Sequence, residues 1–312
     1  MPTGQRPKGR LARWIHQEQF ILAHPMNLGK PIRATLRFLA WATWTRLIRR
    51  PLPIRFWDDL RLMAHADDRI AKLAVYTGLP DYDDMLFTLR YLRPTDTVVD
   101  VGANIGIYSL LAARAVPQGR VLAFEPNPIT AKRMRTNLRL NGLDNVRLRA
   151  SAVGSRAGSA TLTARLGPGD HIALDRSSEV ETITVPLTTL DAAVERAALV
   201  SLIKIDVEGF ELEVLRGATD LLGRDDPPAW IIEVNGLSER YGAGDAAIEE
   251  IFRRHDYGMY LYDARTNRLL DASSAGFRTT YDDRSRWIAE VGINVLFIRG
   301  VENAVERLAR GR

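Results

Sequence analysis

The segment Asp100-Val-Gly-Ala-Asn-Ile-Gly106 follows a short apolar stretch and has residue types suited to binding a small ligand. Gly102 and Gly106 would let the backbone turn sharply and approach a ligand that a Cβ atom would exclude. A helix over Ile107–Ala115 would direct its free N–H groups to the same place. Asn104 stands where a dinucleotide-binding fingerprint has its middle glycine, and Asp100 would repel a diphosphate. The segment therefore favours a cationic or amine-bearing ligand such as S-adenosylmethionine (SAM) over a plain strand-to-helix turn.

Polar residues also end the next apolar stretches of the chain. Glu125 lies about 20 residues downstream, where an acidic side chain accepts hydrogen bonds from both hydroxyls of a ribose. Ser151 and Ala152 end a third stretch, where the third strand of such a sheet would meet an adenine ring. Asp206 and Glu208 follow a fourth stretch. Because ligands bind at the carboxyl edge of open parallel sheets, these residues are expected to surround one site.

The elements that must position these residues alternate between strands and helices. Continuous apolar runs predict strands buried on both faces at Thr97–Val101, Arg120–Glu125, Val146–Ala152, Val200–Asp206 and Trp230–Val234. Apolar residues recur at helical spacing in Tyr108–Ala115, Ile129–Leu140 and Glu211–Leu222. Further strands are predicted at Tyr257–Tyr262 and Ile293–Ile298, with an exposed strand pair in Ala160–Pro186, joined through Gly167–His171. This order predicts an α/β fold, doubly wound around a parallel sheet.

The combination of motifs resembles the FkbM family of SAM-dependent methyltransferases. It comprises Asp-Val-Gly-Ala-Asn-Ile-Gly, Glu-Pro-Asn, Ser-Ala-Val-Gly, Thr188-Thr-Leu-Asp191 and Lys-Ile-Asp-Val-Glu-Gly-Phe-Glu, within Thr97–Asn235. The resemblance implies a Rossmann-like class I fold, with a mostly parallel seven-stranded sheet whose last strand is antiparallel. It also implies methylation of a hydroxyl on a polyketide, sugar or lipid-borne glycan. The SAM contacts that it implies are Asp100, Gly102, Asn104, Gly106, Glu125 and Asn127.

Such a reaction needs an acceptor oxygen held in line with the methyl group and a group that takes its proton. Asp206 is the first candidate for that base, or for holding a divalent ion that acidifies the hydroxyl. Contact with the SAM amine is its alternative role. Glu208 is the second candidate, with stabilisation of its own helix as the alternative. His65 and His171 are further candidate bases. The alternative for each is a solvated loop histidine without a catalytic role. The need for a metal stays open.

Positive charge is concentrated at the N-terminus. Residues 1–50 hold ten Lys and Arg against Glu18 alone, a charge of +9, whereas the whole chain carries +5 and the rest therefore −4. We expect a basic, mainly helical extension over residues 1–80, a methyltransferase domain over 81–300 and a tail over 301–312. The chain has no cysteine, which excludes disulfides, thiolate nucleophiles and Cys-ligated zinc.

A helix predicted from Pro31 to Arg50 leaves two interpretations open. Its face of Leu36, Leu39, Ala40, Thr43 and Leu47 could dock onto the methyltransferase body. Residues 31–57 could instead contact an anionic membrane, since four of the six tryptophans lie by residue 57, among arginines. No apolar run approaches the roughly 20 residues of a membrane span. A cytoplasmic location is therefore expected, and the alternative is peripheral contact with a membrane.

The basic N-terminus also permits an alternative function, methylation of RNA or another nucleic acid. Enzymes that methylate bases usually stack a flipped base on aromatic rings. The segment Asp226-Pro-Pro-Ala229 lies ahead of the predicted fifth strand and lacks such a ring, so it is interpreted as a loop. A small-molecule or glycan hydroxyl is the expected acceptor, and the oligomeric state is not predicted.

Overall fold

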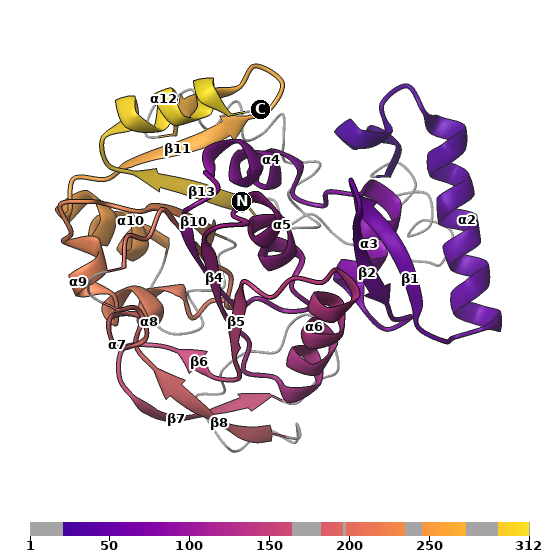
Figure 1. Ribbon diagram of the computed structural model, residues 1–312, viewed down its shortest axis with the longest axis horizontal. Helices are drawn as coiled ribbons and strands as arrows, with labels where there is room; N and C mark the ends of the chain where they lie inside the picture. The colour runs from indigo at the N-terminus through magenta and orange to yellow at the C-terminus, as the bar shows by residue number, and fades with distance from the viewer. Residues whose placement is uncertain (1–20, 164–181, 196–197, 235–244, 273–292, 312) are drawn as a thin grey trace. The chain divides into compact units, whose positions relative to one another are not determined.

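The computed structural model describes residues 21–163, 182–195, 198–234, 245–272 and 293–311. The described residues divide into an N-terminal unit, up to Tyr82, and a larger unit that begins at Asp83 (Figure 1). The connection predicted at Gly167–His171, and with it the candidate base His171, lies outside the described residues.

The N-terminal unit combines helices with a small hairpin. Its elements are η1 (Pro25–Asn27), α2 (Pro31–Leu47), β1 (Leu52–Trp57), β2 (Leu60–Ala64) and α3 (Arg69–Thr77). Strands β1 and β2 pair antiparallel, and Asp58 between them has a left-handed backbone with φ +42°. Leu60, Leu62 and Ala64 alternate as the buried residues of β2. Alternation with a period of two is typical of a strand. It could have indicated this hairpin, which the predicted, mainly helical extension did not include.

Helix α2 buries a different face from the one predicted. Ala34, Phe38 and Trp41 are its buried residues, and the ring of Phe38 lies 5.5 Å from that of Tyr76 on α3. Within its own unit α2 does not pack through the predicted face, because Ala40 and Thr43 are exposed together with Leu36, Leu39 and Leu47. Docking of that face onto the larger unit stays a prediction. Both sets of residues recur at helical spacing, so periodicity could not choose between them.

An eight-stranded sheet forms the centre of the larger unit. Its strand order is β12 (Arg268–Asp271), β11 (Gly258–Asp263), β13 (Ile293–Ile298), β10 (Ala229–Val234), β9 (Leu202–Ile205), β3 (Thr97–Val101), β4 (Arg120–Phe124) and β5 (Val146–Arg149). Strands β5, β4, β3, β9 and β10 are parallel, whereas β13 is antiparallel to both of its neighbours. The predicted class I, doubly wound sheet with an antiparallel last strand is confirmed, and β12 adds an eighth strand at the edge.

Helices surround this sheet, and a second sheet is formed by residues that lie between β5 and β9 in the chain. The helices are α4 (Tyr82–Tyr91), α5 (Ile107–Ala115), α6 (Pro128–Leu140), α7 (Leu190–Ala193), α8 (Glu211–Arg216), α9 (Thr219–Leu222), α10 (Asp245–Arg254) and α12 (Val301–Arg310). The second sheet has the order β6 (Ala152–Val153), β8 (Thr182–Thr188) and β7 (Gly158–Thr163). Residues 301–310, predicted only as part of a tail, form a helix.

Two predicted elements are each divided in the structure. The predicted strand Val146–Ala152 ends at Arg149, and Ala152 begins a strand of the second sheet. The predicted helix Glu211–Leu222 is interrupted at Gly217, where an added Cβ would lie 2.1 Å from the carbonyl oxygen of Gly154. This close approach of two backbones ends α8 and connects it to the segment after β6.

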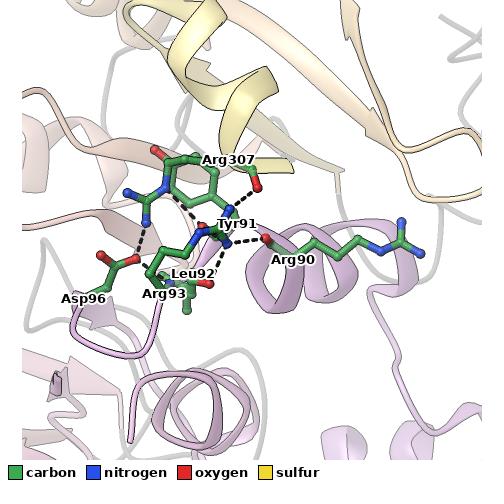
Figure 2. Close-up of polar contacts among 6 residues, drawn as sticks. All are labelled: Arg90, Tyr91, Leu92, Arg93, Asp96 and Arg307. Atoms are coloured by element: carbon green, nitrogen blue, oxygen red, sulfur yellow. Dashed lines mark hydrogen bonds and ion pairs between the residues drawn. The ribbon is translucent and has the colours of Figure 1, made fainter. Parts of the chain in front are cut away.

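A polar cluster fixes α12 to the segment between α4 and β3 (Figure 2). The Arg307 Nε atom donates to the carbonyl of Tyr91 at 3.1 Å, and its guanidinium pairs with Asp96 and lies 4.5 Å from the Tyr91 ring. The Arg93 guanidinium donates to the carbonyls of Arg90 and Leu92 at 3.0 and 2.9 Å. Asp96 also accepts a hydrogen bond from the Arg93 N–H at 2.7 Å. The C-terminal helix is thus bound to the chain immediately before the first parallel strand.

Replacement of Arg307 by alanine should lower the free energy of unfolding by about 2 kcal/mol, because it removes charge-assisted hydrogen bonds to partly buried partners. Arg310→Ala on the same helix removes only an exposed pair with Glu306 and should cost less than about 0.5 kcal/mol. Urea unfolding of both variants measures the difference. Equal losses would contradict a specific anchoring role for Arg307.

Candidate functional site

The loop after β3 lies against the end of β9 because Gly102 has no side chain. An added Cβ at Gly102 would lie 1.8 Å from the carbonyl oxygen of Asp206, and the Gly102 backbone has φ +80°. The N–H groups of Gly102 and Ala103 both donate to the Phe124 carbonyl, at 3.0 and 2.9 Å. The Asp206 N–H donates to the Val101 carbonyl at 3.0 Å. The carboxyl ends of β3, β4 and β9 are therefore joined around the predicted site.

The Glu125 carboxylate holds the glycine loop in place. Its Oε2 atom accepts a hydrogen bond from the Asn104 N–H at 2.9 Å, and its Oε1 atom accepts from the Asn127 N–H at 2.8 Å. Asn104 has a left-handed φ of +52°, which turns its N–H toward that carboxylate. A carboxylate offers about four lone-pair sites. These two backbone bonds therefore leave capacity for the ribose hydroxyls that the sequence predicts here.

The side chains of the two asparagines mainly stabilise local backbone. Asn104 Oδ1 accepts from the Ile105 N–H at 2.8 Å, and Asn127 Oδ1 accepts from the Ile129 N–H at 2.8 Å, capping the N-terminus of α6. Gly106 is the N-cap of α5 and has φ +92°, a conformation that favours glycine. These residues shape the loop through their backbones, so any contact that they make with SAM stays a prediction.

A buried lysine pairs with Asp206 beneath the loop. Lys204, which is 4% exposed, places Nζ 2.8 Å from Asp206 Oδ2 and 4.5 Å from the ring centre of Tyr108. Asp100 is the register partner of Lys204 on β3, and its Oδ2 atom accepts from the Ser109 hydroxyl at 2.6 Å. Burial raises the pKa of Asp100, and the charge of Lys204 opposes that shift. The structure thus favours a role for Asp100 in holding α5 beneath the loop.

Asp206 differs from these groups because its side chain is 37% exposed at the edge of the sheet. Glu233, near the end of β10, hydrogen-bonds to Asp206, and burial followed by the Asp206 charge raises the Glu233 pKa far above its usual range. The raised pKa means that Glu233 holds a proton more readily than an isolated glutamate does. The ammonium of Lys204, 2.8 Å away, favours the ionised form of the Asp206 carboxylate.

Glu211, rather than Glu208, stabilises the turn into helix α8. Its Oε1 atom accepts from the N–H groups of Val207 and Gly209, both at 3.1 Å, and the side chain is fully buried. Burial raises the pKa of Glu211 to about 7. Glu208 lies within this turn, is partly exposed and has a left-handed φ of +54°. The helix-stabilising alternative considered for Glu208 thus belongs to Glu211, while a catalytic role for Glu208 stays a prediction.

The other predicted site residues lie in the second sheet or in the N-terminal unit. Ala152 packs in the second sheet against Leu162 and Val185, and Ser151 is a partly exposed residue immediately before it. Their contact with an adenine ring stays a prediction. His65 follows β2 in the N-terminal unit and stays a candidate base. Among the described residues, no group of three or more His, Asp and Glu side chains is arranged to hold a metal ion.

The Thr-Thr-Leu-Asp motif has a structural role. Thr189 Oγ1 accepts from the Ala192 N–H at 3.1 Å and caps α7. The Asp191 carboxylate accepts from the N–H groups of Asp220 and Leu221, at 2.9 and 3.1 Å, at the start of α9. This motif therefore joins α7 to the start of α9.

Four residues of the site were not predicted from the sequence: Lys204, Glu233, Glu211 and Ser109. A signal existed for the first two, because each is a charged residue within a strand predicted from its apolar neighbours, and buried charges need partners. Glu211 and Ser109 had no such signal, since polar residues are common in the first turn of a helix.

The sequence of this chain is similar to those of known methyltransferases. The sequence profile of the methyltransferase FkbM domain matches residues 100–259. Methyltransferase sdnD of Sordaria araneosa is 30% identical over 196 residues, which cover 51% of this chain and 74% of that protein. The hexuronic acid methyltransferase AglP of Haloferax volcanii is 31% identical, over 56% of this chain and 79% of its own. The 31-O-demethyl-FK506 methyltransferase FkbM of Streptomyces tacrolimicus is 34% identical, over 41% and 62%.

The raised pKa of Glu211 predicts a specific pH dependence of stability. A carboxyl whose pKa rises from 4.5 unfolded to about 7 folded stabilises the fold below pH 4.5 and loses that contribution as pH rises through about 7. Glu211→Gln keeps an oxygen acceptor but no charge. Relative to the parent protein it should therefore gain up to about 3 kcal/mol between about pH 5 and pH 8.

Thermal unfolding at the two pH values measures this gain. Glu249→Gln, which removes an exposed carboxylate on α10, is the matched control and should change little. A Glu211→Gln variant whose stability relative to the parent is the same at both pH values would contradict the buried, protonated state of Glu211.

Proposed function

Because the chain belongs to the FkbM methyltransferase family, as its match to the family profile and to sdnD shows, we propose that it transfers the methyl group of SAM to a hydroxyl on a sugar, a glycolipid or a polyketide-like molecule. The observation that carries this proposal is the junction of the Glu125-bound glycine loop with the partly exposed Asp206, which pairs with Lys204. Methyl transfer to oxygen needs a cofactor cradle and a proton acceptor at adjoining positions.

The residues present fit SAM. Gly102 and Gly106 keep side chains away from the loop, and Glu125 retains hydrogen-bonding capacity for the ribose hydroxyls. The proposed cradle consists of Asp100, Gly102, Asn104, Gly106, Glu125, Asn127, Ser151 and Ala152, with Asp100 acting from beneath the loop. When bound, SAM supplies an electrophilic methyl group.

Asp206 is the proposed base for the acceptor hydroxyl. The Lys204 ammonium at 2.8 Å favours the ionised form of its carboxylate, and Glu233, whose pKa is raised, lies beside it. Its partly exposed position allows a hydroxyl of the acceptor to donate a hydrogen bond to it. Glu208, two residues further along, is the second candidate for the base. The alternative version of this step has Asp206 hold a divalent ion that acidifies the hydroxyl, and EDTA sensitivity separates the two versions.

The names of two relatives support the proposed acceptor class. One is named for a hexuronic acid and the other for 31-O-demethyl-FK506. Incubation of the protein with methyl-labelled SAM and with sugar, glycolipid and polyketide extracts, followed by mass spectrometry, tests the proposal. Label transferred only to nucleic acid or protein would overturn it.

No helix in the described residues is both long and apolar enough to cross a membrane. We propose a cytoplasmic location, with membrane-peripheral contact through residues 31–57.

Asp206→Asn should lower the rate of methyl transfer about 10²- to 10⁴-fold, because the amide cannot accept the hydroxyl proton. SAM affinity should change little, as measured by isothermal titration. Asp225→Asn, which removes an exposed carboxylate outside the proposed site, is the matched control and should leave the rate unchanged. If Asp206→Asn instead keeps its rate and loses only SAM affinity, Asp206 is a cofactor ligand.

Glu125→Gln should weaken SAM binding by about 1.5–3 kcal/mol, because it removes a charged acceptor of hydrogen bonds. Glu306→Gln, an exposed carboxylate on α12, is the control and should leave the affinity unchanged. Isothermal titration gives both values, and circular dichroism checks the fold. Unchanged affinity of a folded Glu125→Gln variant would contradict the ribose assignment.

A further inference from the structure

Helix α2 has a second apolar face that its own unit does not cover. We propose that this face, Ile32, Leu36, Leu39 and Leu47, here called the outer stripe, docks onto an anionic lipid surface. The four side chains are 77%, 61%, 46% and 78% exposed, respectively. The inner face of the same helix is buried, with Ala34, Phe38 and Trp41 at 5% exposed or less.

The outer stripe has the geometry of an interfacial helix. Its members, together with Thr43, recur at intervals of four, three, four and four residues, which aligns them along one side of an α-helix. Large apolar side chains aligned in this way on a protein surface mark an interaction site, whereas scattered ones do not. Because the inner face already supplies the packing of α2 in its unit, the outer stripe is not needed for that packing.

Charge decides which partner fits the outer stripe. Residues 21–57 contain seven Lys and Arg and no Asp or Glu. Arg33, Arg46 and Arg50 are exposed and lie on the helix or just beyond its end. Burial, and then the neighbouring charge of Arg33, lowers the pKa of Arg37, as expected where like charges gather. An apolar stripe among cations complements anionic headgroups over acyl chains, whereas a second copy of α2 would repel it.

The leucines, rather than the tryptophans, carry this contact. Trp41 is 5% exposed, and its ring centre lies 5.0 Å from that of Trp44, with the two rings tilted by 36°. Because it is buried, Trp41 does not lie at the headgroups. The four apolar side chains of the outer stripe, lying in the plane of the interface, would insert at the boundary between headgroups and acyl chains. Each Lys or Arg near the surface should strengthen binding to anionic vesicles about fivefold.

The lipid contact does not depend on the methyl-transfer activity, so the two proposals can fail separately. Flotation of the full-length protein with vesicles of phosphatidylcholine, with and without phosphatidylglycerol, tests the contact. The parent protein should float with the anionic vesicles and remain below the neutral ones. Equal behaviour with both vesicle types, whether bound or unbound, would overturn the proposal.

Two variants locate the contact on α2. The combined substitution Leu36→Ser, Leu39→Ser and Leu47→Ser should reduce binding at least tenfold, through loss of buried apolar area. Arg46→Gln with Arg50→Gln should reduce it roughly thirtyfold, since each charge counts about fivefold. Val305→Ser removes an exposed apolar side chain from α12 and should leave binding unchanged.

Measurements of thermal stability and oligomeric state on the same variants test whether the protein itself or a second copy of it covers the outer stripe. Because lipid is the proposed partner, the variants should have the same melting temperature and the same oligomeric state as the parent protein. A large loss of stability in the triple serine variant would mean that the protein itself covers the outer stripe. Conversion of a parent dimer to a monomer would mean that a second copy covers it. Either result overturns the proposal, and so does unaltered flotation of both variants.

Discussion

The missing side chain at Gly102 is the constraint on which the site depends. A Cβ there would lie 1.8 Å from the Asp206 carbonyl oxygen, so any other residue would push the loop after β3 away from the end of β9. Parallel strands bring their carboxyl ends to one edge, but they do not by themselves bring loops into contact. Here the contact joins the Glu125-bound loop to Asp206, which places a cofactor cradle beside a proposed base.

The ionisable groups around Asp206 differ in their pKa shifts and in their burial. In a low-dielectric environment, neighbouring carboxyls cannot all remain ionised, so burial and mutual repulsion raise the pKa of some of them. The pKa values of Asp100 and Glu233 are raised, while Lys204 forms its ion pair with Asp206. The ammonium of Lys204 therefore favours the ionised form of Asp206, which is partly exposed. The surrounding groups thus tune this carboxyl without needing to touch a substrate.

The N-terminal unit illustrates a different use of apolar residues. Its helix α2 buries Ala34, Phe38 and Trp41 yet leaves Leu36 and Leu47 exposed among arginines. A helix with apolar residues on two faces costs solubility unless one face has a partner outside its own unit. Together with the acid-free composition of residues 21–57, this constraint supports a membrane surface as the partner.

The sequence by itself determined the parallel strands, the glycine loop and the Glu125 position, because these follow from local apolar runs and from turn chemistry over a few residues. It also located Asp206 at the edge of the sheet. Only the tertiary structure decided that Ala152 belongs to a second sheet, that Glu233 pairs with Asp206 and that α2 packs through Phe38. The physical reason is that pairing register and burial depend on contacts between segments far apart in the chain, for which one helical or strand period gives no information.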